Sequence, residues 1–143
     1  MSVEERFTYA LHHAARMWKG ALDRKLRDLG LNQAGWMSIA SIAKATSPLS
    51  QGELAALVQV EAATMVSTIN RLEKMGLVQR LTSEHDRRIK HLALTPKGDV
   101  LYGRLRERAM AQRHEFLRHM DAEKLAVATQ FLEDLQLIIE KNP

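Results

Sequence analysis

The stretch from Ser50 to Gly76 constrains the fold more than any other part of this chain, because it holds two short helical patterns separated by a tight turn. Residues 50–53, SQGE, match a capping box, in which a Ser and a Glu side chain accept hydrogen bonds at the start of a helix. A short apolar pattern follows, with Leu54, Ala55, Leu57 and Val58 on its buried side, and residues 59–61 leave room only for a turn before the next helix. Two short helices joined by about three or four residues are typical of a helix-turn-helix.

The second helix of this pair, residues 61–76, sorts into two faces at helical spacing. The apolar face consists of Met65, Val66, Ile69, Leu72 and Met75, and the opposite face of Thr64, Ser67, Thr68 and Arg71. Short side chains allow a close approach to a surface, and hydroxyl groups can bond phosphate oxygens or base edges. We therefore predict a recognition helix for DNA. The residues expected at the DNA surface are Ser50, Gln51, Ala62, Ala63, Thr64, Ser67, Thr68, Arg71 and Lys74.

The pattern changes period after Gly76, where residues 77–81 and 89–94 alternate as two strands. The polar segment 82–88, TSEHDRR, joins them. A hairpin with a basic tip directly after a recognition helix predicts a wing, whose tip can enter the minor groove, where Arg is favoured. We expect Arg87 and Arg88 at this tip, and Lys74, Arg80 and Lys90 at the phosphates.

Charge is concentrated in this part of the chain. The segment from Arg71 to Lys97 has seven basic and three acidic residues, so it carries the whole net charge of +4 while the remainder balances. A basic segment on a neutral body is the expected electrostatic footprint of a nucleic-acid contact. A solvated basic loop is the alternative for this segment taken alone.

The two ends of the chain are predicted to form long helices, residues 3–29 and, after Thr95-Pro96 and Asp121, two more. They hold more apolar positions than a compact core can cover, which indicates packing against a second copy. A two-fold dimer would place two recognition helices about 34 Å apart, one turn of DNA. We expect a mainly α fold with a small β-hairpin wing (α+β) as a single domain, 1–143. Within it, 1–30 and 96–143 form a helical dimerisation region and 31–95 a winged helix-turn-helix DNA-binding region.

Composition excludes several other classes of protein. With 45% hydrophobic and 27% charged residues, the 143-residue chain suits a globular, soluble domain, and no apolar run approaches the roughly 18 residues that span a bilayer. The acidic N-terminus, MSVEERF, argues against a secretory signal. The absence of cysteine fits a reducing cytoplasm, where we expect the protein. No Gly-rich phosphate loop or cysteine nucleophile is present, so we expect neither an enzyme nor a cofactor.

Three segments together carry a family resemblance: Arg71–Val78 (RLEKMGLV), Asp86-Arg87-Arg88 and Leu92–Gly98 (LALTPKG). In their order and spacing they resemble the signature of the MarR family of bacterial winged helix-turn-helix regulators, and the likeness covers essentially the whole chain. The resemblance implies an obligate homodimer on a pseudo-palindromic operator in double-stranded DNA, often acting as a repressor. It also implies release of the DNA by a small amphipathic or aromatic effector.

The resemblance places Asp86 and Arg88 at the family's Asp-x-Arg wing positions, where the carboxylate orders the guanidinium. A pre-ordered Arg loses less freedom on binding than a mobile Lys. Ser67 departs from the family, because many members carry Arg at this position. Its side chain is too short for a bidentate contact to guanine, so the operator sequence of better-known members does not transfer.

Two other groups of residues are candidates for a site. His12, Arg16 and Trp36, with Met17 and Met37 beside them, suit a pocket for an aromatic carboxylate. The competing and stronger interpretation is that Trp36 is a core residue and Arg16 pairs with a carboxylate. The histidines lack the spacing and the cysteine partners of a zinc site, so we expect surface or interface histidines and no metal.

Two alternatives to a regulator stay open. A helical dimer that binds small molecules without regulating DNA predicts tight ligand binding and no footprint near its own gene. A sequence-tolerant architectural DNA-binding protein predicts similar affinity for an operator and a random duplex, whereas a specific regulator discriminates by about 10³-fold or more.

Overall fold

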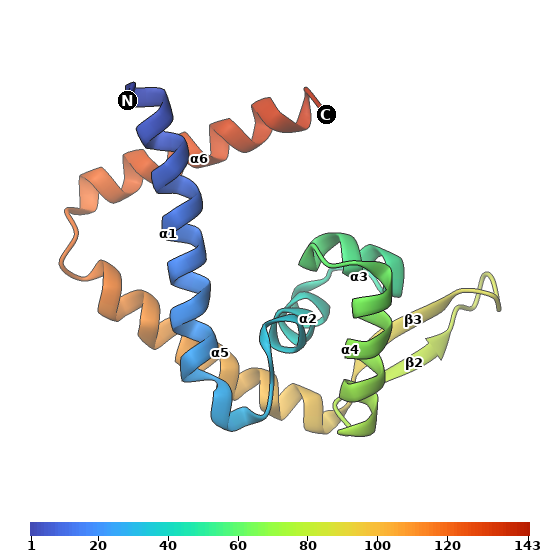
Figure 1. Ribbon diagram of the computed structural model, residues 1–143. Coiled ribbons are helices and arrows are strands. Elements are labelled where there is room, and N and C mark those ends of the chain that lie inside the picture. Colours follow the sequence, from blue (N-terminus) through green and yellow to red (C-terminus); the bar gives the residue numbers. More distant parts are fainter. The chain divides into compact units, whose positions relative to one another are not determined.

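In the computed structural model, which describes residues 1–143, the chain forms six α-helices, a short 3₁₀ helix and one three-stranded sheet (Figure 1). It divides into two compact units, residues 1–109 and 110–143. The predicted mainly α fold with a small β-hairpin wing is confirmed. None of the helices has the length and apolar character needed to cross a membrane. The elements are α1 (Val3–Lys25), η1 (Arg27–Leu29), α2 (Gln33–Lys44), β1 (Leu49–Ser50), α3 (Gln51–Val58), α4 (Ala62–Lys74), β2 (Val78–Thr82), β3 (Lys90–Leu94), α5 (Pro96–Leu117) and α6 (Ala122–Glu140).

The helices after Ser50 and Asp121 start where these capping residues predicted them. The Ser50 hydroxyl accepts from the Glu53 backbone N–H at 3.2 Å, and the Glu53 carboxylate accepts from the Ser50 N–H at 3.1 Å, which completes the capping box of α3. The Asn32 side chain caps α2, and the Asp121 side chain caps α6. Such caps satisfy backbone donors that the helix itself leaves unpaired.

The sheet has the order β1-β3-β2, with both pairs antiparallel. Val78 lies opposite Leu94, and Thr82 opposite Lys90, so β2 and β3 form the predicted hairpin. The two-residue strand β1 pairs Leu49 with Leu92 and was not predicted. A strand this short shows no alternation in the sequence, and its pairing partner lies some forty residues away.

The core of the first unit is assembled around α4. Met65, Ile69 and Leu72 are completely buried, at the i, i+4 and i+7 spacing of one helix side. They pack in one cluster with Leu26 of the α1–η1 junction, Ile39 of α2, Leu54 of α3, Val78 of β2, Leu92 of β3 and Leu105 of α5. Each fully buried aliphatic side chain contributes about 1.5–3 kcal/mol, so this cluster fixes α4 firmly against its neighbours.

Two apolar assignments were wrong. Val66, expected on the apolar face of α4, is 42% exposed, and Leu57, expected on the buried side of α3, is 59% exposed. The buried arc of α4 is centred on Met65, Ile69 and Leu72, and Val66 lies at its edge. An apolar residue at the edge of an amphipathic helix is not buried unless a neighbouring element covers it.

Glycine at position 98 is required by close packing at the start of α5. A Cβ atom there would lie 2.1 Å from the backbone oxygen of Leu77. The Thr95 backbone N–H donates to that same oxygen at 3.0 Å, and the Thr95 hydroxyl accepts from the Gly98 N–H at 3.0 Å. The start of α5 is therefore packed closely against Leu77, the residue that precedes β2.

Arg108 attaches α5 to the loop after α1. Its guanidinium donates to the Lys25 carbonyl at 2.8 Å and to both carboxylate oxygens of Asp28, with Nη2 2.9 Å from Oδ2. This hydrogen bonding lowers the pKa of Asp28 below its usual value of 3.8. The bidentate contact joins segments eighty residues apart in sequence.

Candidate nucleic-acid interface

The helix-turn-helix depends on an unusual backbone conformation at Gln59. This residue follows α3 with φ 61° and ψ 49°, the left-handed region that non-glycine residues rarely adopt. Its N–H and that of Val60 both donate to the Ala55 carbonyl, which closes the end of α3. Only residues 59–61 separate the end of α3 from the start of α4. The sequence holds no glycine or asparagine at this point, so the conformation was not predictable.

The outer face of α4 is largely as predicted. The exposed residues expected at DNA are Ala62, Ala63, Thr64, Ser67, Arg71 and Lys74, while Ser50 and Gln51 at the start of α3 are partly buried. Thr68 was placed wrongly, because it is only 8% exposed and its hydroxyl donates to the Thr64 carbonyl of its own helix at 2.8 Å. The hydroxyl face is therefore narrower than predicted and ends at Thr64 and Ser67.

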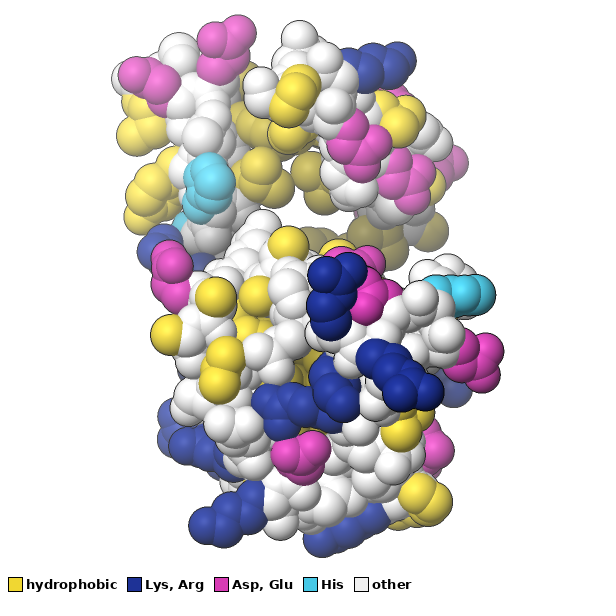
Figure 2. Space-filling model, turned by 90° about the vertical axis from the view of Figure 1, so that its right-hand side faces the viewer, with side chains coloured by type: hydrophobic (Ala, Val, Ile, Leu, Met, Phe, Trp, Pro, Cys, Tyr) yellow, Lys and Arg dark blue, Asp and Glu magenta, His cyan; other side chains and the backbone are white.

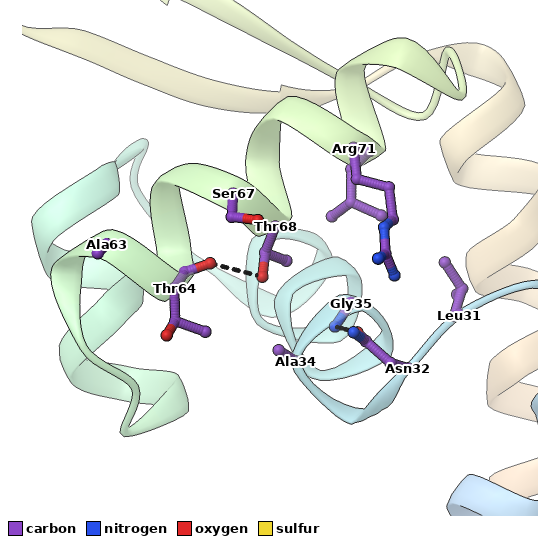
Figure 3. A pocket seen from close by; sticks show the side chains of 10 residues that line it. Leu31, Asn32, Ala34, Gly35, Ala63, Thr64, Ser67, Thr68 and Arg71 are labelled. Carbon is purple, nitrogen blue, oxygen red and sulfur yellow. Dashed lines mark hydrogen bonds between the residues drawn. The ribbon is translucent and has the colours of Figure 1, made fainter.

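A depression of about 330 Å³ borders this face where α4 passes the start of α2. Figure 3 shows the Arg71 side chain directed toward Asn32 and Leu31, with Thr64 and Thr68 farther along the same helix. The Asn32 side chain accepts from the Gly35 N–H at 2.8 Å and so is held at the α2 terminus. Arg71 thus lies at the rim of the exposed face, close to the start of a second helix.

Arg80 does not have the freedom of a surface phosphate contact. It extends from β2 with a side chain that is 24% exposed, and its Nη1 donates to the Glu73 carboxylate at 2.9 Å. Its Nη2 donates to Gln51 Oε1 at 3.1 Å and to Asn70 Oδ1 at 2.9 Å. The prediction that Arg80 projects toward DNA therefore needs correction, because its guanidinium already joins α3, α4 and β2.

The wing tip is ordered by Asp86. Its carboxylate accepts from the Arg88 N–H at 2.9 Å, from Arg88 Nε at 3.2 Å and from Nη2 at 3.1 Å. The hydrogen-bonded guanidinium lowers the pKa of Asp86 below its usual value of 3.8. Arg87 is exposed, and Lys90 donates to the Thr82 hydroxyl across the hairpin at 2.9 Å. The predicted pairing of Asp86 with Arg88 is present, and it holds a cation at an exposed tip.

Basic side chains gather on the unit that carries these elements. Figure 2, seen from the side of the wing, shows several Lys and Arg side chains spread between uncharged surface and a few acidic groups. Arg71, Lys74, Arg87, Arg88 and Lys90 are all exposed. An exposed positive surface around short side chains matches the charge and shape of a duplex backbone.

The predicted effector residues do not form one pocket. His12 and Arg16 line a groove of about 450 Å³ along α1, together with Asp23 and Gln33. Trp36 is instead a core residue, 7% exposed, whose Nε1 donates to Asp23 Oδ1 at 3.2 Å. Met37 packs against the core, and Met17 is 60% exposed. The interpretation of Trp36 as a core residue is confirmed. The pairing of Arg16 with a carboxylate stays a prediction, since the contact found for its guanidinium is with His13 at 3.5 Å.

Asn70 is the residue of this surface that the sequence analysis missed. It is exposed on α4 and lies three residues after Ser67 and four before Lys74, hence on the same helix edge. That spacing was available in the sequence. Its contact with Arg80 was not, because it depends on how β2 packs beside α4.

Comparison with known proteins agrees with this architecture. The MarR family model matches residues 37–90. The crystal structure of the transcriptional regulator PA3341 is 37% identical with a TM-score of 0.87, and the match covers 94% of this chain and 98% of that one. The expected class of protein, a transcriptional regulator, agrees with this relative.

Two more distant structures share the fold. CouR from Rhodococcus jostii RHA1, solved bound to p-coumaroyl-CoA, is 23% identical with a TM-score of 0.80, covering 96% of this chain and 94% of that one. FabT from Streptococcus pneumoniae, solved in complex with DNA, is 23% identical with a TM-score of 0.79, covering 98% and 99%. The helix-turn-helix, the ordered wing and the 37% identical relative lead to one conclusion: this chain belongs to the MarR family of winged helix-turn-helix transcriptional regulators.

Proposed function

We propose that this protein binds a pseudo-palindromic operator in double-stranded DNA as a homodimer and represses transcription. The observation that carries the proposal is the exposed edge of α4 at Ala63, Thr64 and Ser67. Its side chains are short, and the exposed cations Arg71 and Lys74 lie beside them. An α-helix with such an edge fits the major groove. The Asp86–Arg88 pair would place a pre-ordered cation at the neighbouring minor groove.

The proposal of a homodimer is supported by the apolar surface of α6. No residue of this helix is buried, although many of its residues are apolar. Five of them are each more than half exposed: Val127, Phe131, Leu137, Ile138 and Ile139. So many exposed apolar side chains on one helix are uncommon on monomeric proteins. A second copy that covers it would also supply the second recognition helix that a pseudo-palindrome requires.

We further propose that a small amphipathic or aromatic ligand relieves operator binding. The groove along α1 supports this proposal, since His12, Arg16 and Lys19 offer polar and cationic groups beside the apolar Leu11. CouR, which has the same fold, was solved with p-coumaroyl-CoA, an aromatic acyl thioester. A ligand with an anionic group and an apolar body would suit the residues of this groove.

A footprint of the purified protein on the DNA flanking its own gene tests the proposal most directly. The protected segment should be a pseudo-palindrome with half-sites about one helical turn apart. Affinity for this segment should exceed that for a random duplex by about 10³-fold or more, and it should fall steeply with salt.

The same experiment separates the two alternatives. A small-molecule-binding dimer without DNA regulation gives no footprint, and an architectural DNA-binding protein gives equal affinity for both duplexes. A screen for compounds that release the protected segment then tests the ligand. If no compound with an acidic and an aromatic part releases it, the proposal of ligand relief fails while operator binding stands.

A further inference from the structure

Arg80 occupies the centre of a polar cluster that consists of Arg80, Glu73, Gln51 and Asn70. Three of its N–H groups are used, one by the Glu73 carboxylate and two by the side-chain oxygens of Gln51 and Asn70. The three acceptors come from two different helices, and they lie 7 to 29 residues away from Arg80 in sequence. The cluster therefore exists because the fold places these elements together.

The chemistry of the guanidinium fixes how both amides are turned. Arg has hydrogen-bond donors and no acceptor, so it can contact an amide side chain only at the oxygen. The Asn70 oxygen must face Arg80, and the nitrogen of the planar amide must then point away from it. Asn70 is an exposed residue, so the two N–H donors of an amide held in this way are expected to stay open to solvent or a ligand. An unconstrained Asn on a helix surface presents either end.

The position of Asn70 places these donors on the edge proposed to face DNA. Asn70 follows Ser67 by three residues and precedes Lys74 by four, so the three lie along one side of α4. All three are exposed. A donor on this side of a recognition helix is within reach of base edges in the major groove.

We propose that Arg80 is a positioning residue that sets the base preference of Asn70. This inference rests on the proposed operator binding and extends it. An unconstrained Asn reads adenine with two bonds, accepting from N6–H and donating to N7. With its oxygen committed to Arg80, Asn70 acts as a donor. It then favours the acceptor groups of guanine (O6 and N7) or thymine (O4), and disfavours cytosine, which presents a donor.

The charge of Arg80 argues against the simpler role of a phosphate contact. Glu73 opposes the charge at 2.9 Å, and three donors are already engaged. A phosphate would have to replace bonds that join α3, α4 and β2. Lys74, which is exposed one helix turn after Asn70, is the better phosphate contact.

Selection of bound sequences from a randomised duplex tests the proposal, with the full-length protein and three variants. Arg80→Lys keeps the charge but cannot hold three acceptors in one plane. Asn70→Asp keeps an oxygen for Arg80 but carries no donor. Lys74→Met is the matched control, because it removes a nearby cation without touching the cluster. Circular dichroism of each variant verifies that it is folded.

The expected result is that Arg80→Lys and Asn70→Asp change the base preference at the same operator position. The preference for guanine or thymine there should fall roughly tenfold in both, and Arg80→Lys should gain adenine. The salt dependence of binding should stay unchanged in Arg80→Lys. Lys74→Met should instead keep the selected sequence and lower the salt slope by about one.

Three outcomes overturn the proposal. In the first, Arg80→Lys selects the same sequences as the wild-type protein. In the second, the two variants alter different positions. In the third, the wild-type protein selects no sequence at all. This last outcome overturns operator binding itself and the inference with it, whereas the first two leave operator binding intact, so the two failures are distinguishable.

Discussion

Arg88 is held by Asp86 through both its side chain and its backbone. The guanidinium donates from Nε at 3.2 Å and from Nη2 at 3.1 Å, and the backbone N–H donates at 2.9 Å to the same carboxylate. The Arg88 side chain nevertheless remains 90% exposed, whereas that of Asp86 is 33% exposed. One acidic residue therefore shapes the turn and orients a cation that solvent, or a ligand, can reach.

We expect Arg88→Ala to weaken operator binding by about 1–3 kcal/mol while the protein stays folded and dimeric. The wing would lose the cation that it presents to the minor groove. Asp86→Asn should also weaken binding, because the neutral amide holds the guanidinium less firmly. Titration of a labelled operator measures both effects. Loss of the folded dimer in Arg88→Ala would show instead that Arg88 has a structural role.

Acid should destabilise the protein through three carboxyl groups. Hydrogen bonds from Arg108, Ser50 and Arg88 lower the pKa of Asp28, Glu53 and Asp86, respectively, below the usual values of 3.8, 4.5 and 3.8. A carboxyl with a lowered folded pKa stabilises the fold above its unfolded pKa, and this contribution is lost as the pH falls through the folded value. Denaturant unfolding should therefore show stability falling below about pH 4.5. Asp28→Asn should reduce this pH dependence, and an unchanged profile would contradict the assignment to Asp28.

Gly98→Ala should destabilise the protein by about 3 kcal/mol or more, since the added methyl group meets a backbone oxygen that cannot move aside. Gly103→Ala is the matched control. It lies in the same helix, nothing lies within 4 Å of the added atom, and it should stabilise by about 0.5–1 kcal/mol. Thermal unfolding of both variants provides the comparison. Equal effects of the two substitutions would refute the close contact at Leu77.

Loss of a hydroxyl group should affect operator binding at Ser67 but not at the adjacent Thr68. Ser67→Ala is expected to weaken operator binding by about 0.5–1.5 kcal/mol, because an exposed donor at the DNA surface is removed. Thr68→Val should leave operator affinity unchanged, because that hydroxyl bonds the carbonyl of Thr64 inside the fold. Operator titration distinguishes the two. A large loss of affinity in Thr68→Val would show that Thr68 contacts DNA after all.

A charge on the apolar surface of α6 should dissociate the proposed dimer. Ile138 is 58% exposed, and Ile138→Lys would place an ammonium group in the interface expected there. Glu133→Lys, on the same helix and at an exposed position, is the control that should leave the dimer intact. Sedimentation of both variants at micromolar concentration gives their mass. A wild-type monomer would remove the basis of the pseudo-palindromic operator.

The parts of this fold that could be predicted are those with causes a few residues apart. The caps of α2, α3 and α6 depend on Asn32, Ser50 and Asp121, each within three residues of the backbone groups that it bonds. The contact at the wing tip was predictable for the same reason, because Asp86 and Arg88 are two residues apart. Helical spacing likewise predicted that Met65, Ile69 and Leu72 would be buried.

The features that could not be predicted depend on packing between elements that are far apart in the sequence. Thr68 lies inside because α2 covers that side of α4, and no periodicity within α4 gives the width of the covered arc. Trp36 lies in the core and not in the predicted pocket, and its indole N–H donates to Asp23. Arg80 has partners up to 29 residues away. Local sequence determined the order of the elements, their ends and the cation at the wing, because short-range hydrogen bonds and helical spacing are encoded within a few residues. The tertiary structure alone decided how wide the buried side of α4 is and which way Asn70 faces, because both depend on the atoms that neighbouring elements bring to them.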